Sequence, residues 1–263
     1  DQHRGNMKVV LHYRRLGEGN RTPLVILHGL FGSSDNLGSI GTELSQDFDV
    51  LLVDQRDHGR SPHTERITYP AMAEDVHALV VSLGLKDIVL VGHSMGGKTA
   101  MVFGQRWPEL LKQLVVLDIS PREHDDNHAH IIAALRTSDL STGRTRKEVE
   151  DHIKSHVKEP GVVQFIMKNL YWKTPEQLAW RMNVEGLYRD LKHILAPIGH
   201  ETVRVPTLFI RGGQSDYITR ADIPQIKEQF PNSRIETIDF AGHWVHAQAP
   251  HEVVELIRST VQP

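Results

Sequence analysis

A buried strand that turns directly into a helix is the feature that most restricts how this chain can fold. Residues 88–91 are apolar, Gly-His-Ser-Met-Gly follows at 92–96, and residues 95–106 have a helical pattern. A serine protrudes from so sharp a turn only if its flanking residues are small, because the two backbone arms approach closely. The turn therefore predicts a serine nucleophile, Ser94, at a helix N-terminus that favours developing negative charge.

Strands and helices alternate in the first and last parts of the chain, which is typical of an α/β fold. Four apolar runs rich in Val, Ile and Leu predict strands buried on both faces of a parallel sheet; they occupy residues 24–27, 50–53, 88–91 and 114–117. Two further strands are expected at 206–210 and 234–238. Helical patterns accompany them at 39–46, 70–83, 95–106, 223–230 and 251–261. Residues 8–16 are expected to add antiparallel strands at one edge. The prediction is a mostly parallel sheet flanked by helices.

The alternation stops between residues 122 and 200. Polar helical patterns such as 144–158 and 174–194 occupy this segment, with no recognisable strand. About 79 residues could barely support an independent core, so we favour a helical cap over a second domain. The predicted organisation is an α/β core built from 1–121 and 201–263, with a cap inserted at 122–200.

A phosphate-binding turn is the competing interpretation of residues 92–97. Lys98 and Thr99 resemble the end of a P-loop, and Gly92 stands five residues before Gly97, as that motif requires. However, the intervening His-Ser-Met would protrude into the space that a phosphate needs. We therefore favour the nucleophile.

Four motifs in this order resemble the α/β-hydrolase superfamily over nearly the whole chain. They are His-Gly-Leu-Phe-Gly at 28–32, Asp-x-Arg-x-x-Gly-x-Ser at 54–61, the serine turn, and Gly-His-Trp at 242–244. More narrowly, the segments 29–33, 117–121 and 242–246 resemble a branch of small bacterial esterases and acyl-thioesterases. The resemblance implies a serine hydrolase with a catalytic triad.

The catalytic base must lie on a loop that returns to the strand ends beside the serine. His243 follows the expected last strand and precedes the final helix, and it is the histidine of the Gly-His-Trp motif. His246 is the alternative, which would otherwise pack at the loop–helix junction or line the pocket. His93 is expected to project to another side of the turn and form a local hydrogen bond. We therefore predict that His243 is the base.

Two aspartates are candidates for the acid that orients the imidazole. Most of the resembled family carries Gly-x-x-Asp after the penultimate strand. Counted from Gly212 that position is Ser215, and only a count from Gly213 reaches Asp216. The expected strand favours the first count. Asp118 ends the strand beside the serine strand and needs no shift, and the resembled esterases share this feature, so we favour Asp118 over Asp216.

Acyl transfer develops negative charge on a carbonyl oxygen, which two main-chain N–H groups usually receive. The residue after the nucleophile, Met95, and the residue after His-Gly, Leu30, are expected to supply them. Candidate substrate contacts are aromatic residues, although such residues more often belong to a core; they are Phe31, Phe165, Tyr171, Trp172 and Trp244.

Composition restricts the chemistry further. The 263 residues include no cysteine, which excludes disulfides and thiolate catalysis. Thirty basic and 33 acidic residues give a net charge of −3, so nucleic acid is not an expected partner.

No apolar run approaches the ~20 residues of a membrane span, and residues 1–6 show no apolar leader region, so a cytoplasmic protein is expected.

A metal site is the remaining alternative for one polar segment. His124, His128 and His130 lie close to Asp125 and Asp126, and a spacing of four on a helix can serve a metal. Because this segment is charged and expected to be solvated, we predict no metal and no cofactor.

These features together predict a serine carboxylesterase or thioesterase, monomeric or homodimeric, that forms an acyl-serine intermediate. Its substrates would be small to medium acyl esters or acyl-CoA-like molecules. Serine at position 94 excludes the dehalogenase and epoxide-hydrolase chemistries, which need an aspartate there. Carbon–carbon bond hydrolysis and perhydrolysis are alternatives, although Leu30 and Phe31 replace the glycine-rich loop common in carbon–carbon hydrolases. A binding or receptor protein that keeps a hydrolase shell is another.

Overall fold

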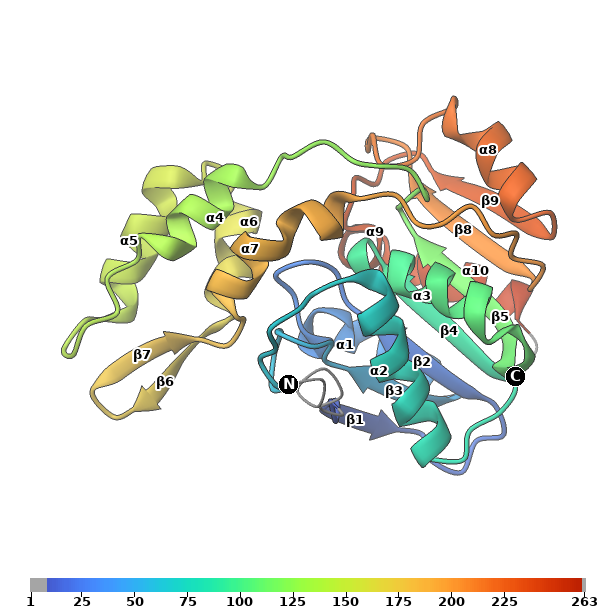
Figure 1. The fold of residues 1–263 in the computed structure, drawn as a ribbon, viewed down its shortest axis with the longest axis horizontal. Coiled ribbons are helices and arrows are strands. Elements are labelled where there is room, and N and C mark those ends of the chain that lie inside the picture. Colours follow the sequence, from blue (N-terminus) through green and yellow to red (C-terminus); the bar gives the residue numbers. More distant parts are fainter. Residues whose placement is uncertain (1–8, 262–263) are drawn as a thin grey trace, which may run out of the picture.

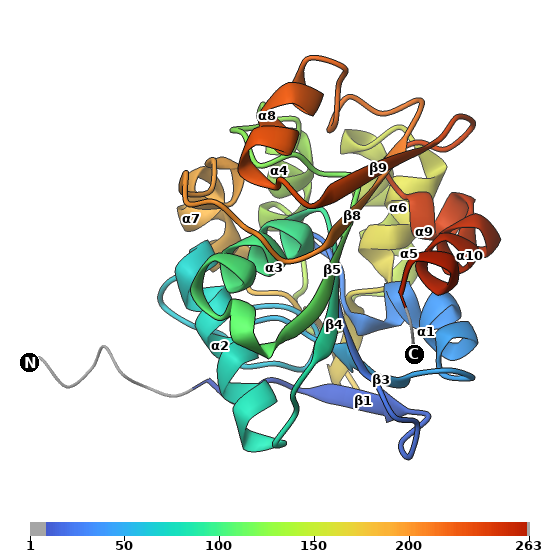
Figure 2. The same cartoon turned by 90° about the vertical axis from the view of Figure 1, so that its right-hand side faces the viewer.

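A seven-stranded sheet forms the centre of the protein in a computed structural model that describes residues 9–261 (Figures 1 and 2). The strand order is β1-β3-β2-β4-β5-β8-β9; β1 is antiparallel to β3, and the other pairings are parallel. The strands are β1 (Tyr13–Leu16), β2 (Pro23–Leu27), β3 (Asp49–Val53), β4 (Ile88–His93), β5 (Leu111–Leu117), β8 (Thr207–Gly212) and β9 (Ser233–Ile238). This confirms the predicted α/β class with a mostly parallel sheet.

Helices cover both faces of this sheet, which explains why its central strands β2, β3, β4 and β5 lack polar alternation (Figure 2). One face carries α2 (Tyr69–Ser82) and α3 (Met95–Arg106); the other carries α1 (Gly38–Leu44) and α10 (Pro250–Thr260). The other core helices are η2 (Ser34–Leu37), η3 (Pro108–Leu110), α8 (Asp222–Gln229) and α9 (Val245–Gln248). Within β2, Val25 and Leu27 pack into the core on the α2–α3 side, while Leu24 and Ile26 pack on the α1–α10 side. None of the helices within residues 9–261 is both long and apolar enough to cross a membrane.

Within the described residues, one antiparallel strand precedes the parallel strands, where more than one was expected. Tyr13–Leu16 pairs with β3 at the edge of the sheet. Lys8, where these antiparallel strands were expected to begin, and residues 1–6, expected to lack a leader, lie outside the described residues.

The inserted segment forms a lobe beside the core (Figure 1). Its helices are α4 (Ala129–Arg136), α5 (Arg146–His156), α6 (Pro160–Met167) and α7 (Val184–Leu195), and its strands are β6 (Leu170–Thr174) and β7 (Gln177–Trp180). The two chain segments that join the lobe to the core run side by side, because the His124 N–H bonds the Leu195 carbonyl and the Ile198 N–H bonds the Pro121 carbonyl.

The β6–β7 hairpin corrects the expectation that this segment holds no strand and that a helix covers 174–194. Pro175 disfavours a helical conformation at Thr174, and Trp172 pairs with Leu178 across the turn. The helix begins only at Val184, where the Asn183 side chain accepts a hydrogen bond from the Gly186 N–H at 3.2 Å.

Candidate active site

Ser94 occupies the turn between β4 and α3 with a left-handed backbone, φ 54° and ψ −117°. The turn has no space for larger neighbours. A Cβ on Gly92 would overlap the Gly96 carbonyl, and a Cβ on Gly96 would overlap the Leu27 carbonyl. The Ser94 N–H bonds the Leu117 carbonyl of β5 at 3.1 Å. Strain of order 1–3 kcal/mol at the serine is therefore held by the surrounding sheet, and the side chain lines a pocket.

Ser94, His243 and Asp118 form a continuous chain of hydrogen-bonded side chains. His243 Nε2 lies 3.0 Å from Ser94 Oγ, and His243 Nδ1 lies 2.8 Å from Asp118 Oδ2. An ionised carboxylate only accepts, so it fixes the imidazole proton on Nδ1 and leaves Nε2 able to accept the Ser94 proton. Asp118 is fully buried, and its Oδ1 accepts the Gly212 N–H at 2.8 Å. His243 thus lies within hydrogen-bonding distance of both Ser94 and Asp118, the two partners that the sequence indicated.

The alternative acid, Asp216, takes no part in this chain. It is exposed, and its main-chain carbonyl accepts a hydrogen bond from Arg122. Gly212 is the last residue of β8, and the residue three positions on, Ser215, donates its hydroxyl to Asp118 Oδ2 at 2.5 Å. The Gly-x-x-Asp position after β8 is therefore counted from Gly212, and Ser215 occupies it in this chain.

Two buried histidines support the loop that carries His243. His93 Nε2 donates to the His243 carbonyl at 2.8 Å, and its ring packs edge-on against His246 with centroids 4.4 Å apart. Burial, aided by neighbouring histidines, lowers the pKa of His93 well below 6.5 and the pKa of His246 to about 3. Both rings are therefore neutral at neutral pH. His246 lines the pocket, while His243 reaches Ser94.

The imidazole of His243 contacts two other rings. Tyr217 stacks on it with centroids 3.7 Å apart and planes 17° from parallel, and His93 lies 4.8 Å away. Tyr217 is not among the residues predicted from the sequence. Its position just beyond the carboxyl end of β8, where parallel sheets place their sites, is the signal that could have found it.

The two expected oxyanion donors lie on segments beside the nucleophile. Met95 begins α3, where a main-chain N–H has no partner within the helix. A Cβ on Gly29 would stand 3.3 Å from the Ser94 Cβ, so the loop that carries Leu30 lies directly against the serine. The assignment of both N–H groups to an oxyanion hole stays a prediction.

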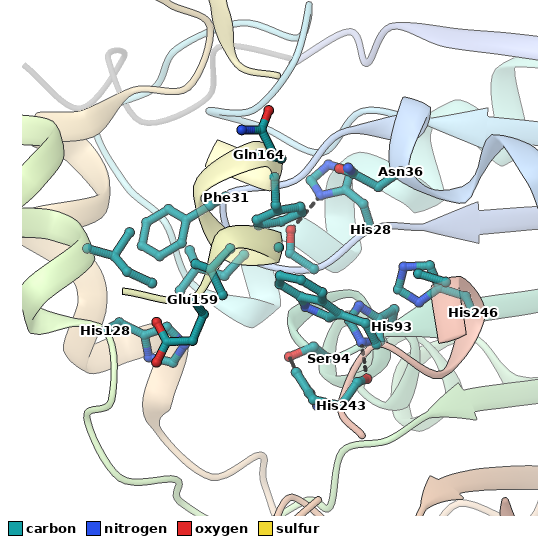
Figure 3. A pocket seen from close by; sticks show the side chains of 18 of the residues that line it. His28, Phe31, Asn36, His93, Ser94, His128, Glu159, Gln164, His243 and His246 are labelled. Carbon is teal, nitrogen blue, oxygen red and sulfur yellow. Dashed lines mark hydrogen bonds between the residues drawn. The ribbon is translucent and has the colours of Figure 1, made fainter. Parts of the chain in front are cut away.

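A pocket of about 640 Å³ opens at Ser94 between the core and the insertion. Figure 3 shows Phe31 and His128 on one side of Ser94, with His93 and His246 on the other. Both lobes of the protein contribute, since α4 supplies Ile131.

Three of the five aromatic residues proposed as substrate contacts line this pocket. They are Phe31, Phe165 and Trp244, and the rings of the last two lie 5.0 Å apart. The other two are not among its lining residues, because β6 carries them away from it. There Tyr171 stacks on Arg181 with 3.8 Å between its ring centroid and the guanidinium carbon, and Trp172 is exposed.

The polar segment 124–130 is not arranged as a metal site. Within residues 9–261, no group of three or more His, Cys, Asp or Glu side chains is placed to hold a metal ion. His124 Nε2 donates to the Ser120 carbonyl at 3.1 Å, and burial lowers its pKa to about 4. His128 and His130 line the pocket.

Lys98, the residue behind the phosphate interpretation, is also engaged elsewhere. It is 1% exposed, and its ammonium donates to the carbonyls of Arg122 and Ala196, both at 2.7 Å. Burial lowers the pKa of Lys98 to about 7. The lysine thus bonds both connections of the insertion and does not face an anion site.

Comparisons with known proteins agree with this architecture. Residues 22–159 match the alpha/beta hydrolase fold family. The chain is 41% identical over 256 residues to the sn-1-specific diacylglycerol lipase ABHD11 of Danio rerio, covering 94% of this chain and 80% of that protein. It is 37% identical to the esterase YbfF of Escherichia coli, covering 91% and 92%. A solved marine microorganism esterase superposes with a TM-score of 0.93 at 41% identity, covering 96% of this chain and all of that one.

Proposed function

This chain belongs to the α/β-hydrolase family, and on that premise we propose that it hydrolyses carboxylic esters or thioesters through a covalent acyl-Ser94 intermediate. The observation that carries the proposal is the hydrogen-bonded chain from Ser94 Oγ through His243 to Asp118. The names of its relatives, an esterase and a lipase, support the ester class.

Acylation follows from the positions of these groups. Ser94 Oγ attacks the substrate carbonyl while His243 Nε2 accepts the hydroxyl proton. Asp118 stabilises the imidazolium that forms. The N–H groups of Leu30 and Met95 donate to the oxyanion of the tetrahedral intermediate, each worth roughly 3–4 kcal/mol. His243 then gives its proton to the departing alkoxide or thiolate, and the acyl group stays on Ser94.

Deacylation repeats the sequence with water. His243 takes a proton from the water that attacks the acyl carbonyl, the oxyanion forms against the same donors, and His243 returns the proton to Ser94 Oγ. The products are a carboxylic acid and the free enzyme.

The pocket favours an apolar acyl group of small to medium length. Its volume of about 640 Å³ lies in the ordinary range for small-molecule sites. Apolar side chains from the core and from the insertion, including Phe31, Phe165 and Trp244, line it. Burying the acyl chain against them contributes about 0.8 kcal/mol for each methylene.

Turnover of p-nitrophenyl esters and acyl-CoA thioesters of graded length tests this function. We expect hydrolysis by the native chain, an acyl adduct on Ser94 by intact-mass measurement, and loss of both in Ser94→Ala. Absence of turnover on every ester and thioester would contradict the proposal and favour carbon–carbon bond hydrolysis or a binding role.

A further inference from the structure

We propose that Asn169, which belongs to the insertion, is a positioning residue for the oxyanion hole. Together with His58 of the core it holds Phe31 at both of its polar main-chain groups, so that the adjacent Leu30 N–H is presented to the reacting carbonyl. The inference rests on the proposed function and makes oxyanion stabilisation depend on how the insertion packs on the core.

Phe31 is held in an uncommon backbone conformation. Its φ is +65°, in the left-handed region that non-glycine residues seldom adopt. Its N–H donates to His58 Nε2 at 3.2 Å, and its carbonyl accepts from Asn169 Nδ2 at 2.8 Å. Phe31, His58 and Asn169 are all buried. One bond from each lobe thus maintains a backbone conformation that is unfavourable by itself.

His58 acts only as an acceptor toward this loop. Its Nδ1 lies 2.9 Å from the Arg56 carbonyl, which cannot donate, so Nδ1 carries the proton and Nε2 accepts. Burial lowers the pKa of His58 to about 3, so this arrangement persists at neutral pH. Because His58 occupies the Phe31 N–H, that group is not free for a substrate. Leu30 is therefore the donor that the loop offers.

The hydrogen bonds of the Gly29 carbonyl fix the orientation of the Leu30 N–H. It shares a planar peptide unit with the Gly29 carbonyl, and the two groups point in opposite directions. The Gly29 carbonyl accepts from His28 Nδ1 at 2.8 Å and from the Gly32 N–H at 3.0 Å. These bonds hold the carbonyl toward the core and polarise the unit, which strengthens the N–H as a donor.

Asn169 is itself fixed by the insertion. It lies between α6 and β6, its N–H bonds the Ile166 carbonyl at 3.0 Å, and its carbonyl accepts the Arg181 N–H at 2.8 Å. Its amide also reaches the Ile166 carbonyl at 3.2 Å. A shift of α6 against the core would move the amide from the Phe31 carbonyl and loosen the loop beside Ser94.

The test compares Asn169→Ala with Asn183→Ala. Asn183 is another asparagine of the insertion that bonds the core, through its Nδ2 and Asp57 Oδ1 at 2.8 Å, but it does not bond the oxyanion loop. We expect Asn169→Ala to lower kcat roughly tenfold to hundredfold with KM changed less than about twofold. Its inhibition constant for a trifluoromethyl ketone, which forms an oxyanion on the serine, should rise by the factor that kcat/KM falls.

The opposite results overturn the inference. They are an unchanged ketone inhibition constant in Asn169→Ala, or a rise no larger than in Asn183→Ala. If Asn169→Ala does not fold, His58→Gln and Asn169→Asp test the same hydrogen bonds to Phe31. The measurements are again the effects on kcat and KM and the inhibition constant of the ketone. A native chain that neither hydrolyses esters nor binds the ketone refutes the proposed function instead, whereas an active native chain with unaffected Asn169 variants refutes only the positioning role.

Discussion

Ser215 Oγ donates a 2.5 Å hydrogen bond to Asp118 Oδ2, the same carboxylate oxygen that His243 Nδ1 approaches at 2.8 Å. Asp118 Oδ1 accepts the Gly212 N–H, so the buried carboxylate has three donors around it. The position after β8 where the resembled family most often carries its acid therefore holds a hydroxyl that supports an acid directly after β5.

The first prediction separates the two candidate acids. Asp118→Asn should lower kcat by about 10³-fold to 10⁴-fold, because an amide favours the wrong imidazole tautomer and cannot stabilise the imidazolium. Asp216→Asn should stay within about threefold of the native chain, since exposed Asp216 lies outside the hydrogen-bonded chain. Steady-state kinetics on one ester decides between them. A large loss in Asp216→Asn alone would show that Asp118 is the wrong choice.

The second prediction concerns Ser215. Ser215→Ala removes a donor to a buried carboxylate, which is worth about 1.5–3 kcal/mol, and should lower kcat about tenfold or more. The double variant Asp118→Asn/Ser215→Asp moves the carboxylate from position 118 to position 215, the two side chains that are hydrogen-bonded to each other in the native chain. We expect it to regain at least tenfold in kcat over Asp118→Asn alone. No regain would show that position 215 cannot orient His243.

The third prediction tests the ring that stacks on His243. Tyr217→Phe keeps the stacked face and should retain most activity, whereas Tyr217→Leu removes it. Loss of a π face that favours the imidazolium, worth about 0.5–2 kcal/mol, should lower kcat about twofold to thirtyfold. A Leu variant whose kcat equals that of the Phe variant would contradict this role.

The strands and the serine turn could be predicted because each depends on local sequence. Val, Ile and Leu runs report burial on both faces, and Gly92 and Gly96 report a close backbone approach that the structure contains. The register after β8 was also readable, since Gly212 ends that strand.

Contacts across the sequence could not be predicted in this way. Asn169 and Phe31 lie 138 residues apart, and nothing beside Asn169 indicates that its amide meets a core loop. Tyr217 meets His243 only because β8 and β9 end side by side. The β6–β7 hairpin was missed because helix formers surround Pro175, whose effect on Thr174 was the available signal.

The fourth prediction is a loss of stability in mild acid. Burial lowers the pKa of His246 from 6.5 to about 3, so between pH 6.5 and 3 the unfolded chain binds a proton that the folded chain does not. Stability is therefore complete above pH 6.5 and falls as pH drops, by up to about 1.4 kcal/mol per pH unit for each such histidine. Urea unfolding at several pH values measures how the free energy of unfolding changes with pH. This change should be less steep in His246→Gln than in the native chain. An equal pH dependence in both chains would contradict the prediction.

The fifth prediction concerns acyl length. Phe165 faces Trp244 across 5.0 Å in the pocket, so Phe165→Ala should open space for a longer acyl chain. Beyond the length at which the native kcat/KM stops rising, the variant should keep gaining about fourfold for each methylene, the equivalent of 0.8 kcal/mol. A series of p-nitrophenyl esters measures this. Trp172→Ala is the matched control, because this exposed aromatic of the same insertion is not among the residues that line the pocket and should leave the length profile unchanged. If both variants shift the profile equally, Phe165 does not limit acyl length.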